Sequence, residues 1–253
     1  MEYLLTPERH RLILERVNEK EVVKIQELVE ITASSESTIR RDLQILEEQK
    51  YIKRVHGGAS LLQGKRIELG IPEKSTKNLQ DKIAISKFAA SLVEDGDCIY
   101  LDAGTTTYQM IQFLTDKDIL VVTNGLTHIE SLLDNNMSTY LLGGLIKSKT
   151  RALIGSGALT SLEHYRFDKC FLGVNGVHHQ YGYTTPDPEE ALIKKTAIHL
   201  SRETFVLADS SKFGDVSFSK IEKINKAKII TTETDPDVLA SYEAKTKIKV
   251  VTA

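Results

Sequence analysis

The stretch SSESTIRRDLQIL, residues 34–46, decides the fold of the N-terminal part of the chain. Its apolar residues Ile39, Leu43 and Leu46 recur at helical spacing and predict a helix that starts after Ser35, a residue type that caps helices well. The opposite, exposed face of this helix carries polar side chains, namely Ser37, Arg40, Arg41 and Gln44. Such side chains can contact base edges and phosphates from a helix in the major groove.

The surrounding sequence supplies the rest of a winged helix-turn-helix. One helix is predicted to start at Thr6-Pro7-Glu8 and another to cover 24–31, and both precede the helix after Ser35. The alternating segment 51–55 predicts a strand that ends at the turn His56-Gly57-Gly58. We therefore expect a DNA-binding domain over residues 1–60, with Lys53, Arg54 and His56 on the wing.

Net charge does not establish DNA binding by itself. Residues 1–60 hold 10 Lys/Arg and 11 Asp/Glu, whereas residues 37–56 hold five Lys/Arg against three Asp/Glu. Positive charge is thus concentrated around the predicted recognition helix. From spacing alone, the Arg40-Arg41 pair is equally compatible with a solvated surface helix.

Composition indicates an ordinary globular protein. The chain has 253 residues, of which 41% are hydrophobic and 27% charged, and its formal net charge is −2. No apolar run approaches the ~20 residues of a membrane span, and the start lacks the apolar region of a signal peptide, so we expect a cytoplasmic protein. Cys98 and Cys170 form no CxxC pair and the histidines have no metal-ligand spacing, so we expect no disulfide, no metal and no cofactor.

The rest of the chain predicts a second domain. Residues 61–80 contain Gly64, Gly70 and Pro72 among polar residues and are expected to be a linker. Over 81–253, short apolar runs alternate with helical patterns, which predicts an α/β domain with a mainly parallel sheet covered on both faces. The predicted strands are 98–101, 119–123, 139–142, 170–174, 204–208, 227–231 and 248–251.

Polar residues follow these strands and predict a ligand site. The segment Asp102–Thr107 combines a glycine with threonine hydroxyls ahead of a helix, which suits an anion, although it is neither a Walker A nor a GxGxxG motif. Other strands end in Thr123-Asn124-Gly125, Gly173–Gly176 and Asp209–Lys212. Because ligands of open α/β sheets bind at the carboxyl ends of the strands, we expect a pocket for a small anion such as a phosphorylated polyol. Each motif taken singly is also compatible with a simple turn.

Both halves resemble one family. The segment 35–43, followed by Arg54–Ala59, is similar to the N-terminal signature of the DeoR family of bacterial transcriptional regulators. The second half resembles the effector domain of that family through 102–106, 123–124, 142–144, 167–168 and 209–212. We accordingly expect the DNA-binding residues to be Ser35, Ser37, Thr38, Arg40, Arg41, Gln44, Lys53, Arg54 and His56.

The resemblance also implies an effector. The family's effector domain is similar in fold to ribose-phosphate isomerases and CoA transferases, and its effectors are typically sugar phosphates. By this resemblance the phosphate would be held by Gly104, Thr105, Thr106, Thr107 and Lys212. The sugar would face Asp102, Asn124, Asn175, Glu190 and Asp209. The chain looks closest to fructose-operon repressors, which implies fructose 1-phosphate, while lactose-type regulators that respond to tagatose phosphate remain open.

Two functional classes fit these features. One is a repressor that binds operator DNA as a dimer or tetramer and responds to a phosphorylated sugar. The other is a sugar-phosphate isomerase with an accessory helical domain, for which Asp187, Glu190 and Lys194 could supply acid–base groups. A metabolic isomerase has no use for a base-reading helix, so we predict the repressor, without enzymatic activity.

Overall fold

The computed structural model describes residues 4–20, 22–49, 51–55, 57–61, 69–234 and 236–253. The chain divides into two compact units, Met1–Gly64 and Lys65–Ala253, and each has its own hydrophobic core. Within the described ranges, no helix is both long and apolar enough to cross a membrane.

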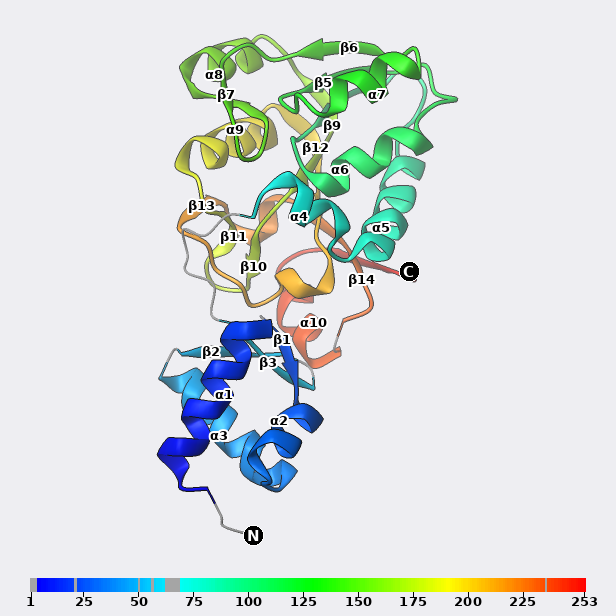
Figure 1. Ribbon diagram of the computed structural model, residues 1–253. Coiled ribbons are helices and arrows are strands. Elements are labelled where there is room, and N and C mark those ends of the chain that lie inside the picture. The colour runs from blue at the N-terminus through cyan, green and yellow to red at the C-terminus, as the bar shows by residue number, and fades with distance from the viewer. Residues whose placement is uncertain (1–3, 21, 50, 56, 62–68, 235) are drawn as a thin grey trace. The chain divides into compact units, whose positions relative to one another are not determined.

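The first unit confirms the predicted winged helix-turn-helix (Figure 1). Its described residues form α1 (Thr6–Lys20), α2 (Ile25–Thr32), α3 (Glu36–Glu48) and an antiparallel sheet of β1 (Val22–Lys24), β2 (Ile52–Val55) and β3 (Gly58–Leu61), in the order β1-β3-β2. The apolar faces of the helices and the sheet meet in one core, which includes Ile13, Leu28, Ile39, Leu46 and Ile52. The helix after Ser35 is therefore anchored by the residues whose spacing predicts it.

The short strand β1 is not expected from the sequence, where the second helix is predicted to start at Lys24. Val22 to Lys24 instead pair with β3, in a register that places Val23 opposite Ala59. This pairing brings two backbones close together, because a Cβ atom on Gly58 would lie only 2.0 Å from the carbonyl oxygen of Val23. A glycine is needed at that position for the wing to pair with β1.

A buried salt bridge joins α3 to α1. The Asp42 side chain accepts hydrogen bonds from the Arg9 guanidinium, one of them 3.0 Å long, and its Oδ1 lies 3.1 Å from Nε2 of His10. Burial alone would raise the pKa of the Asp42 carboxyl, but the hydrogen bonds from Arg9 and His10 outweigh burial, and the pKa lies below its ordinary value. Asp42 directly follows Arg41, so this ion pair fixes the helix from behind its exposed face.

We expect Asp42→Asn to lower the free energy of unfolding of the first unit by about 1.5–3 kcal/mol, because the Arg9 guanidinium loses its anionic partner. The folded-state pKa of Asp42 is depressed, so this contribution is present above the pKa of the unfolded carboxyl. It is lost as the pH falls through the folded-state pKa, and the two proteins should converge in acid. Urea titrations followed by circular dichroism at neutral and acidic pH measure both effects.

The matched control is Glu15→Gln, which removes the exposed 2.9 Å pair between Arg11 and Glu15 on α1. Exposed pairs of this kind contribute at most about 1 kcal/mol. If Asp42→Asn and Glu15→Gln changed stability equally, the buried salt bridge would not be holding α3 in place.

The second unit is built on a parallel sheet that contains all seven predicted strands. The described strands are arranged in the order β15-β14-β12-β9-β4-β5-β6, and neighbours in this order pair in parallel. Their bounds are β4 (Cys98–Leu101), β5 (Leu120–Thr123), β6 (Ser138–Leu141), β9 (Phe167–Gly173), β12 (Ser201–Leu207), β14 (Lys228–Thr232) and β15 (Ile248–Val251). The chain runs outward from β4 on one side and from β9 on the other, so the strand order reverses between them. In open α/β sheets, ligands bind at such a reversal, outside the carboxyl ends of the strands.

Helices cover both faces of this sheet, as predicted (Figure 1). Alternate residues of β4 show the two sides, because Ile99 packs with Ile85 in one core while Tyr100 packs with Leu162 and Ile193 in the other. The helices on the first side are α5 (Leu79–Ser91), α6 (Thr105–Met110) and α7 (His128–Asp134), and those on the second are α8 (Gly155–Glu163), α9 (Pro188–His199) and α10 (Pro236–Glu243). Short 3₁₀ turns cover Ile111–Phe113, Ser210–Lys212 and Ile224–Lys226.

Two small antiparallel additions were not predicted from the sequence. One is the hairpin of β7 (Leu145–Lys147) and β8 (Ala152–Ile154), and the other is the sheet of β10 (Gly176–His178), β11 (Gly182–Thr185) and β13 (Ser219–Glu222). Each strand has only three or four residues. That length is too short for an alternation of polar and apolar residues to stand out.

The linker expected over 61–80 is shorter at its C-terminal end than predicted. Residues 71–76 form helix α4 and α5 starts at Leu79, so the second unit begins before residue 81. Pro72 lies in the first turn of α4, where proline is favoured because its missing N–H is not needed. Residues 62–68, which include Gly64, lie outside the described residues.

Candidate DNA interface and effector site

The outer face of α3 carries the side chains that the sequence predicts there. Those of Ser37, Arg40, Arg41 and Gln44 are exposed, whereas those of Ile39, Leu43 and Leu46 are buried. Arg40 bonds to Glu36 over one helical turn, with Nε 3.0 Å from Oε1, and Gln44 donates to Glu48 at 3.1 Å. Arg41 makes no hydrogen bond or ion pair within the described part of the chain. Its guanidinium is therefore the one on this helix that has no protein partner to give up on binding a base or a phosphate.

The other predicted DNA-binding residues have different surroundings. Ser35 caps α3, because its hydroxyl accepts the Thr38 N–H at 3.2 Å and contacts the Ser37 and Thr38 hydroxyls at 2.9 and 2.8 Å. These hydroxyls support the start of the helix. Lys53 and Arg54 lie on β2, where Arg54 is exposed, and His56 lies outside the described residues.

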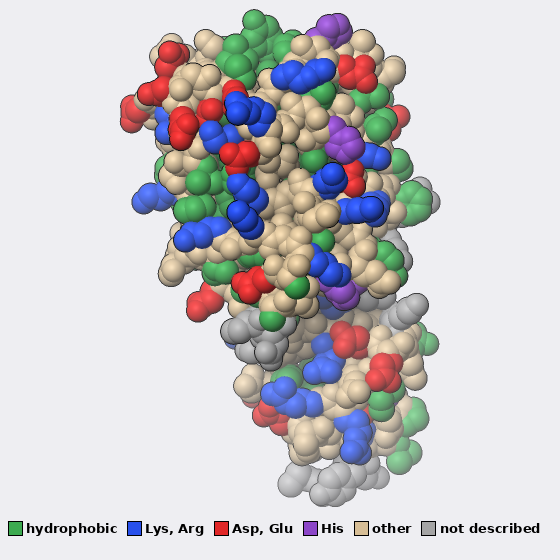
Figure 2. All heavy atoms as spheres, turned by 180° about the vertical axis from the view of Figure 1, so that it is seen from behind, with side chains coloured by type: hydrophobic (Ala, Val, Ile, Leu, Met, Phe, Trp, Pro, Cys, Tyr) green, Lys and Arg blue, Asp and Glu red, His purple; other side chains and the backbone are tan. Residues whose placement is uncertain are grey.

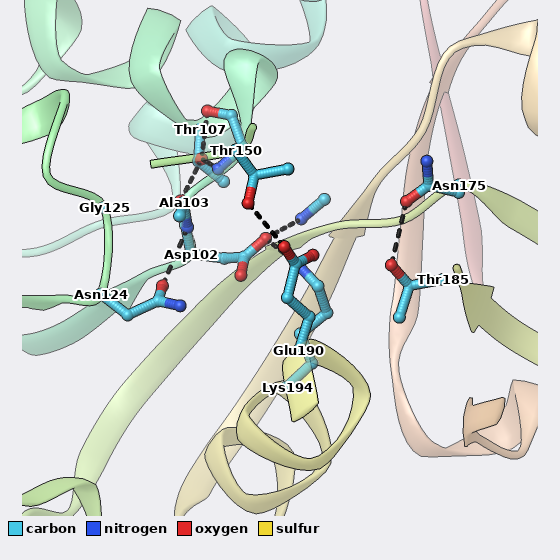
Figure 3. A network of polar contacts seen from close by, with 12 residues as sticks. Asp102, Ala103, Thr107, Asn124, Gly125, Thr150, Asn175, Thr185, Glu190 and Lys194 are labelled. Carbon is cyan, nitrogen blue, oxygen red and sulfur yellow. Dashed lines mark hydrogen bonds and ion pairs between the residues drawn. The ribbon is translucent and has the colours of Figure 1, made fainter. Parts of the chain in front are cut away.

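In the second unit, Asp102 occupies the strand-order reversal. It directly follows β4, is 1% exposed, and accepts a hydrogen bond from the backbone N–H of Gly173 at the end of β9 at 3.1 Å. The same oxygen accepts a hydrogen bond from the ammonium of Lys194 on α9 (Figure 3). The carboxylate thus joins two neighbouring strands and a helix at the point where a ligand is expected.

Glu190 extends this charged cluster toward the β7–β8 hairpin. Its Oε1 lies 3.0 Å from the ammonium of Lys147 and accepts the Thr150 hydroxyl at 2.7 Å. Burial would raise the pKa of Glu190, but Lys194, the Thr150 hydroxyl and Lys147 hold it below its ordinary value. Figure 3 shows Glu190 and Asp102 pointing toward each other from α9 and the β4 loop. The cluster offers carboxylate oxygens and ammonium groups, which are suitable partners for sugar hydroxyls.

The three threonines after Gly104 differ in orientation. The Thr107 hydroxyl is fully buried, donates to the carbonyl of Gly104 at 2.8 Å and lies 3.3 Å from Nε2 of His128. Burial lowers the pKa of His128 to about 4, so its ring is neutral at pH 7. By contrast, the hydroxyls of Thr105 and Thr106 make no hydrogen bond within the described residues. In the first turn of α6, these two hydroxyls are therefore without a protein partner among the described residues, although Thr106 itself is buried.

The side chains of both predicted asparagines form hydrogen bonds within the protein. Asn124 is buried, and its amide bridges two loops by accepting the Ala103 N–H at 3.0 Å and donating to the Leu153 carbonyl at 3.3 Å. Asn175 accepts the Thr185 hydroxyl at 3.1 Å, and in Figure 3 these two residues lie apart from the Asp102 and Glu190 cluster. Asn124 therefore holds the shape of the β4 loop.

A second cluster follows β12, next to β9 in the sheet. Asp209 is 2% exposed and accepts hydrogen bonds from Asn78 at 3.0 Å and from the Ser211 N–H at 3.1 Å, and Lys212 lies 3.5 Å from its other oxygen. Burial would raise the pKa of Asp209, but Lys212 and the hydrogen bonds from Ser211 and Asn78 keep it below its ordinary value.

Lys82 of α5 lies near this second cluster and was not among the residues predicted from the sequence. It is 5% exposed, and its ammonium donates to the backbone carbonyl of Lys74. Burial lowers its pKa from 10.5 to about 8, opposed by Asp209 and reinforced by Lys212 and the neighbouring lysines. One helical turn further along, Ser86 donates to the Thr106 carbonyl at 2.7 Å, which connects this face of α5 to the first turn of α6. The sequence signal that could have identified Lys82 is its helical spacing with Ile85, Ser86 and Ala89, which predicts that all four residues lie on one buried face of the helix.

The described residues provide no candidate metal site. Among the described residues, no three His, Cys, Asp or Glu side chains are grouped so that they could hold a metal ion. Cys98 and Cys170 are free thiols, and Cys170 is buried.

Comparison with known proteins identifies the family. Residues 9–65 match the DeoR-like helix-turn-helix domain, and residues 77–234 match the DeoR C terminal sensor domain. The chain belongs to the DeoR family. It is 55% identical to the HTH-type transcriptional regulator FruR of Bacillus subtilis (strain 168), in an alignment that covers 98% of this chain and 99% of the relative. It is 33% identical to the lactose phosphotransferase system repressor of Staphylococcus epidermidis over 94% of each protein.

Among solved structures, ribose 5-phosphate isomerase A of Methanocaldococcus jannaschii aligns with 54% of this DeoR-family chain and 55% of its own, at 19% identity and a TM-score of 0.42. The relatives that match nearly the whole chain are transcriptional regulators. The chain is therefore a DNA-binding transcriptional repressor of the DeoR family and not an enzyme, and the isomerase alternative is set aside.

We expect Arg41→Ala to weaken binding to the specific operator by about 1–3 kcal/mol, because a free guanidinium on the outer face of α3 is lost. Arg40→Ala should cost less, since Arg40 must first leave Glu36. Gel-shift titrations at one fixed salt concentration, against operator and unrelated DNA, measure both affinities. Wild-type operator affinity in Arg41→Ala would show that this face of α3 does not read DNA.

Proposed function

We propose that this repressor controls a sugar-utilisation operon and releases its operator when a phosphorylated sugar binds at the carboxyl ends of β4, β9 and β12. Fructose 1-phosphate is the effector that we favour, because the chain resembles fructose-operon repressors and is 55% identical to FruR. The observation that carries the proposal is the buried Lys82, on the same face of α5 as Ser86, which donates to the Thr106 carbonyl in the first turn of α6. A regulator that acts on operator DNA would work in the cytoplasm.

The two clusters suggest how the effector is oriented. Lys82 and Lys212, together with the hydroxyls of Thr105 and Thr106, would hold the phosphate beside Gly104. Asp102, Glu190 and Lys194 would bind the sugar hydroxyls, with Asp209 between the two ends. In this assignment Thr107 and Asn124 hold the loop after β4 in place through hydrogen bonds within the protein. Asn175 lies further away, and its amide nitrogen makes no hydrogen bond within the described residues.

Relief of repression requires the sugar phosphate to bind the DNA-incompetent state more tightly than the DNA-binding state. The difference in binding free energy is typically ~1–3 kcal/mol. A single helix-turn-helix reads few base pairs, so we propose that the protein acts as a homo-oligomer, a dimer or tetramer, on repeated half-sites. An effector that stabilises one arrangement of the subunits would then change the spacing of the recognition helices.

Thr106→Asp should abolish the response to the effector while leaving operator binding intact. It places a carboxylate where the phosphate must lie, and like charges at close range should weaken binding by about tenfold or more. Thr106→Asn is the matched control, because it has the same size without the charge. Calorimetric titration with fructose 1-phosphate measures the loss, and unphosphorylated fructose should not bind wild type. An unchanged affinity in Thr106→Asp would place the effector elsewhere.

Lys82→Met should have opposite effects on stability and on effector binding. Without effector it should raise the melting temperature at neutral pH, because it removes the cost of burying an ammonium. That cost is present below pH 8 and fades as the pH rises toward 10.5, so the gain in stability should shrink in alkali. Effector affinity should fall about 10- to 100-fold, since a charge-assisted hydrogen bond contributes about 1.5–3 kcal/mol.

The control is Lys87→Met, a substitution at an exposed position on the same helix. Thermal melts and effector titrations from pH 7 to about pH 9 separate the two effects of Lys82. Wild-type affinity should weaken as Lys82 loses its proton, and that pH dependence should be missing in Lys82→Met. A variant that keeps full effector affinity would remove Lys82 from the site.

A further inference from the structure

Three of the residues proposed to bind the effector are buried in the structure. The side chains of Lys82, Thr106 and Asp209 are 5%, 7% and 2% exposed. A phosphorylated sugar is polar and several times larger than a water molecule, so it cannot pass through a close-packed interior. Part of the second unit must therefore move before an effector reaches these groups.

Helix α4 (Ile71–Thr76) is held to the second unit by few contacts. None of its residues is buried. The Ser75 hydroxyl donates to the Ile71 carbonyl at 2.7 Å, within the helix itself. The Thr76 hydroxyl likewise donates to the Glu73 carbonyl at 3.3 Å. Because an element with few buried contacts opens at a small cost in free energy, α4 is suited to move.

The same helix lies against the groups assigned to the phosphate. The ammonium of Lys82 donates to the backbone carbonyl of Lys74, in the second half of α4. α4 also packs on α6, which begins with Thr105 and Thr106, and Figure 1 shows the two helices next to each other. A helix without buried residues is therefore in contact both with Lys82 and with the helix that carries the threonine hydroxyls.

The two ends of α4 are suited to act as hinges. Gly70, its N-cap, has no side chain to restrict the backbone. At the other end, Asn78 adopts a positive φ of 52° just before α5, and its amide donates to Asp209 at 3.0 Å. Hinges are formed by a few residues at the ends of elements. Asn78 thus anchors one end of α4 to the effector site, while Gly70 leaves the other end free to turn.

Charge favours closure of α4 when an anion is bound. Burial is the main cause that lowers the pKa of Lys82 to about 8, and the positive charges of Lys74 and Lys77 add to its effect. These lysines repel the Lys82 ammonium, whereas a bound phosphate dianion would attract all three. On the opposite face of the second unit, which Figure 2 shows, basic and acidic side chains are interspersed, so their charges largely offset each other.

Given the effector site proposed above, we propose that α4 is a lid, which opens to admit the phosphate group of the effector and closes over it. In the closed state the Lys82 ammonium would donate both to the Lys74 carbonyl and to the phosphate, since an ammonium has three donors. The phosphate would thus hold the lid through Lys82. α4 is also the first helix of the second unit along the chain, so closure fixes the point where the chain enters that unit.

Hydrogen–deuterium exchange of the full chain without DNA, in the presence and absence of fructose 1-phosphate, tests whether α4 opens. Without effector, the backbone amides of residues 74–76 should exchange about tenfold or more faster than those of residues 85–90 in α5. Saturating fructose 1-phosphate should slow the exchange of the α4 amides about tenfold or more. The amides of α10 are the internal control, and their exchange should not change.

Gly70→Ala tests whether this movement controls binding and release of the effector. The added methyl fits the closed helix, because its nearest neighbours, Pro72 Cδ and the Lys149 carbonyl oxygen, lie 3.6 and 4.0 Å away. Replacing a glycine at a compatible position restricts the hinge, so opening should become about two- to fivefold rarer. The dissociation rate of fructose 1-phosphate, measured by phosphorus NMR, should fall by the same factor. Its equilibrium affinity should stay unchanged, because binding slows equally.

The matched control is Gly143→Ala, whose methyl would meet nothing within 4 Å and which should release the effector like wild type. Calorimetry establishes that fructose 1-phosphate binds. If it binds while the α4 amides keep their exchange rate, or if Gly70→Ala releases it as fast as wild type, the lid proposal is wrong. Equal slowing by Gly143→Ala would also overturn it. If fructose 1-phosphate does not bind, the proposed effector is wrong instead, and the exchange rates of α4 and α5 without effector still decide whether α4 opens.

Discussion

The second unit depends on one buried charge, the carboxylate of Asp102. At 1% exposure it must be neutralised, and Lys194 of α9 and the Gly173 N–H supply its partners. This contact holds the ends of β4 and β9 together where the strand order reverses. Because Lys194 lies one helical turn from Glu190, it also positions the carboxylate that holds the β7–β8 hairpin through Thr150. The ion pair between Asp102 and Lys194 thus connects the strand ends to α9, and Glu190 connects α9 to the hairpin through Thr150 and Lys147.

The main sheet was predictable largely because its central strands are buried on both faces. A buried strand needs apolar residues at consecutive positions, and such runs stand out, as Cys98–Leu101 and Leu120–Thr123 do. The strands β1, β7, β8, β10, β11 and β13 have three or four residues each and pair in small antiparallel sheets. Their residues show no alternation or apolar run that would predict a strand, because these strands form only where another part of the chain is placed to pair with them. Val22 to Lys24 form a strand only because Gly58 lets β3 approach.

The sequence predicts where the candidate site residues gather, but not which contacts each of them makes. Parallel strands end at one edge, so the residues after them had to gather there. Which side chains remain available depends on hydrogen bonds that sequence does not show. Thr105, Thr106 and Thr107 are the same residue type, yet the hydroxyl of Thr107 is consumed inside the loop. Arg40 and Arg41 differ in the same way, because only Arg40 has an acid one turn away.

The two ends of the proposed effector site differ in electrostatic character, and this difference would determine which ligand fits. At one end, Lys194 is matched by Asp102 and lies beside Glu190, so its ammonium is already neutralised. At the other end, the surroundings of Lys82 combine the carboxylate of Asp209 with the ammonium groups of Lys212, Lys74 and Lys77. A ligand with hydroxyls at one end and a dianionic phosphate at the other would satisfy both ends in one orientation only. A neutral sugar would bring no negative charge to this end, so in the proposed site the phosphate would select the ligand as well as its direction.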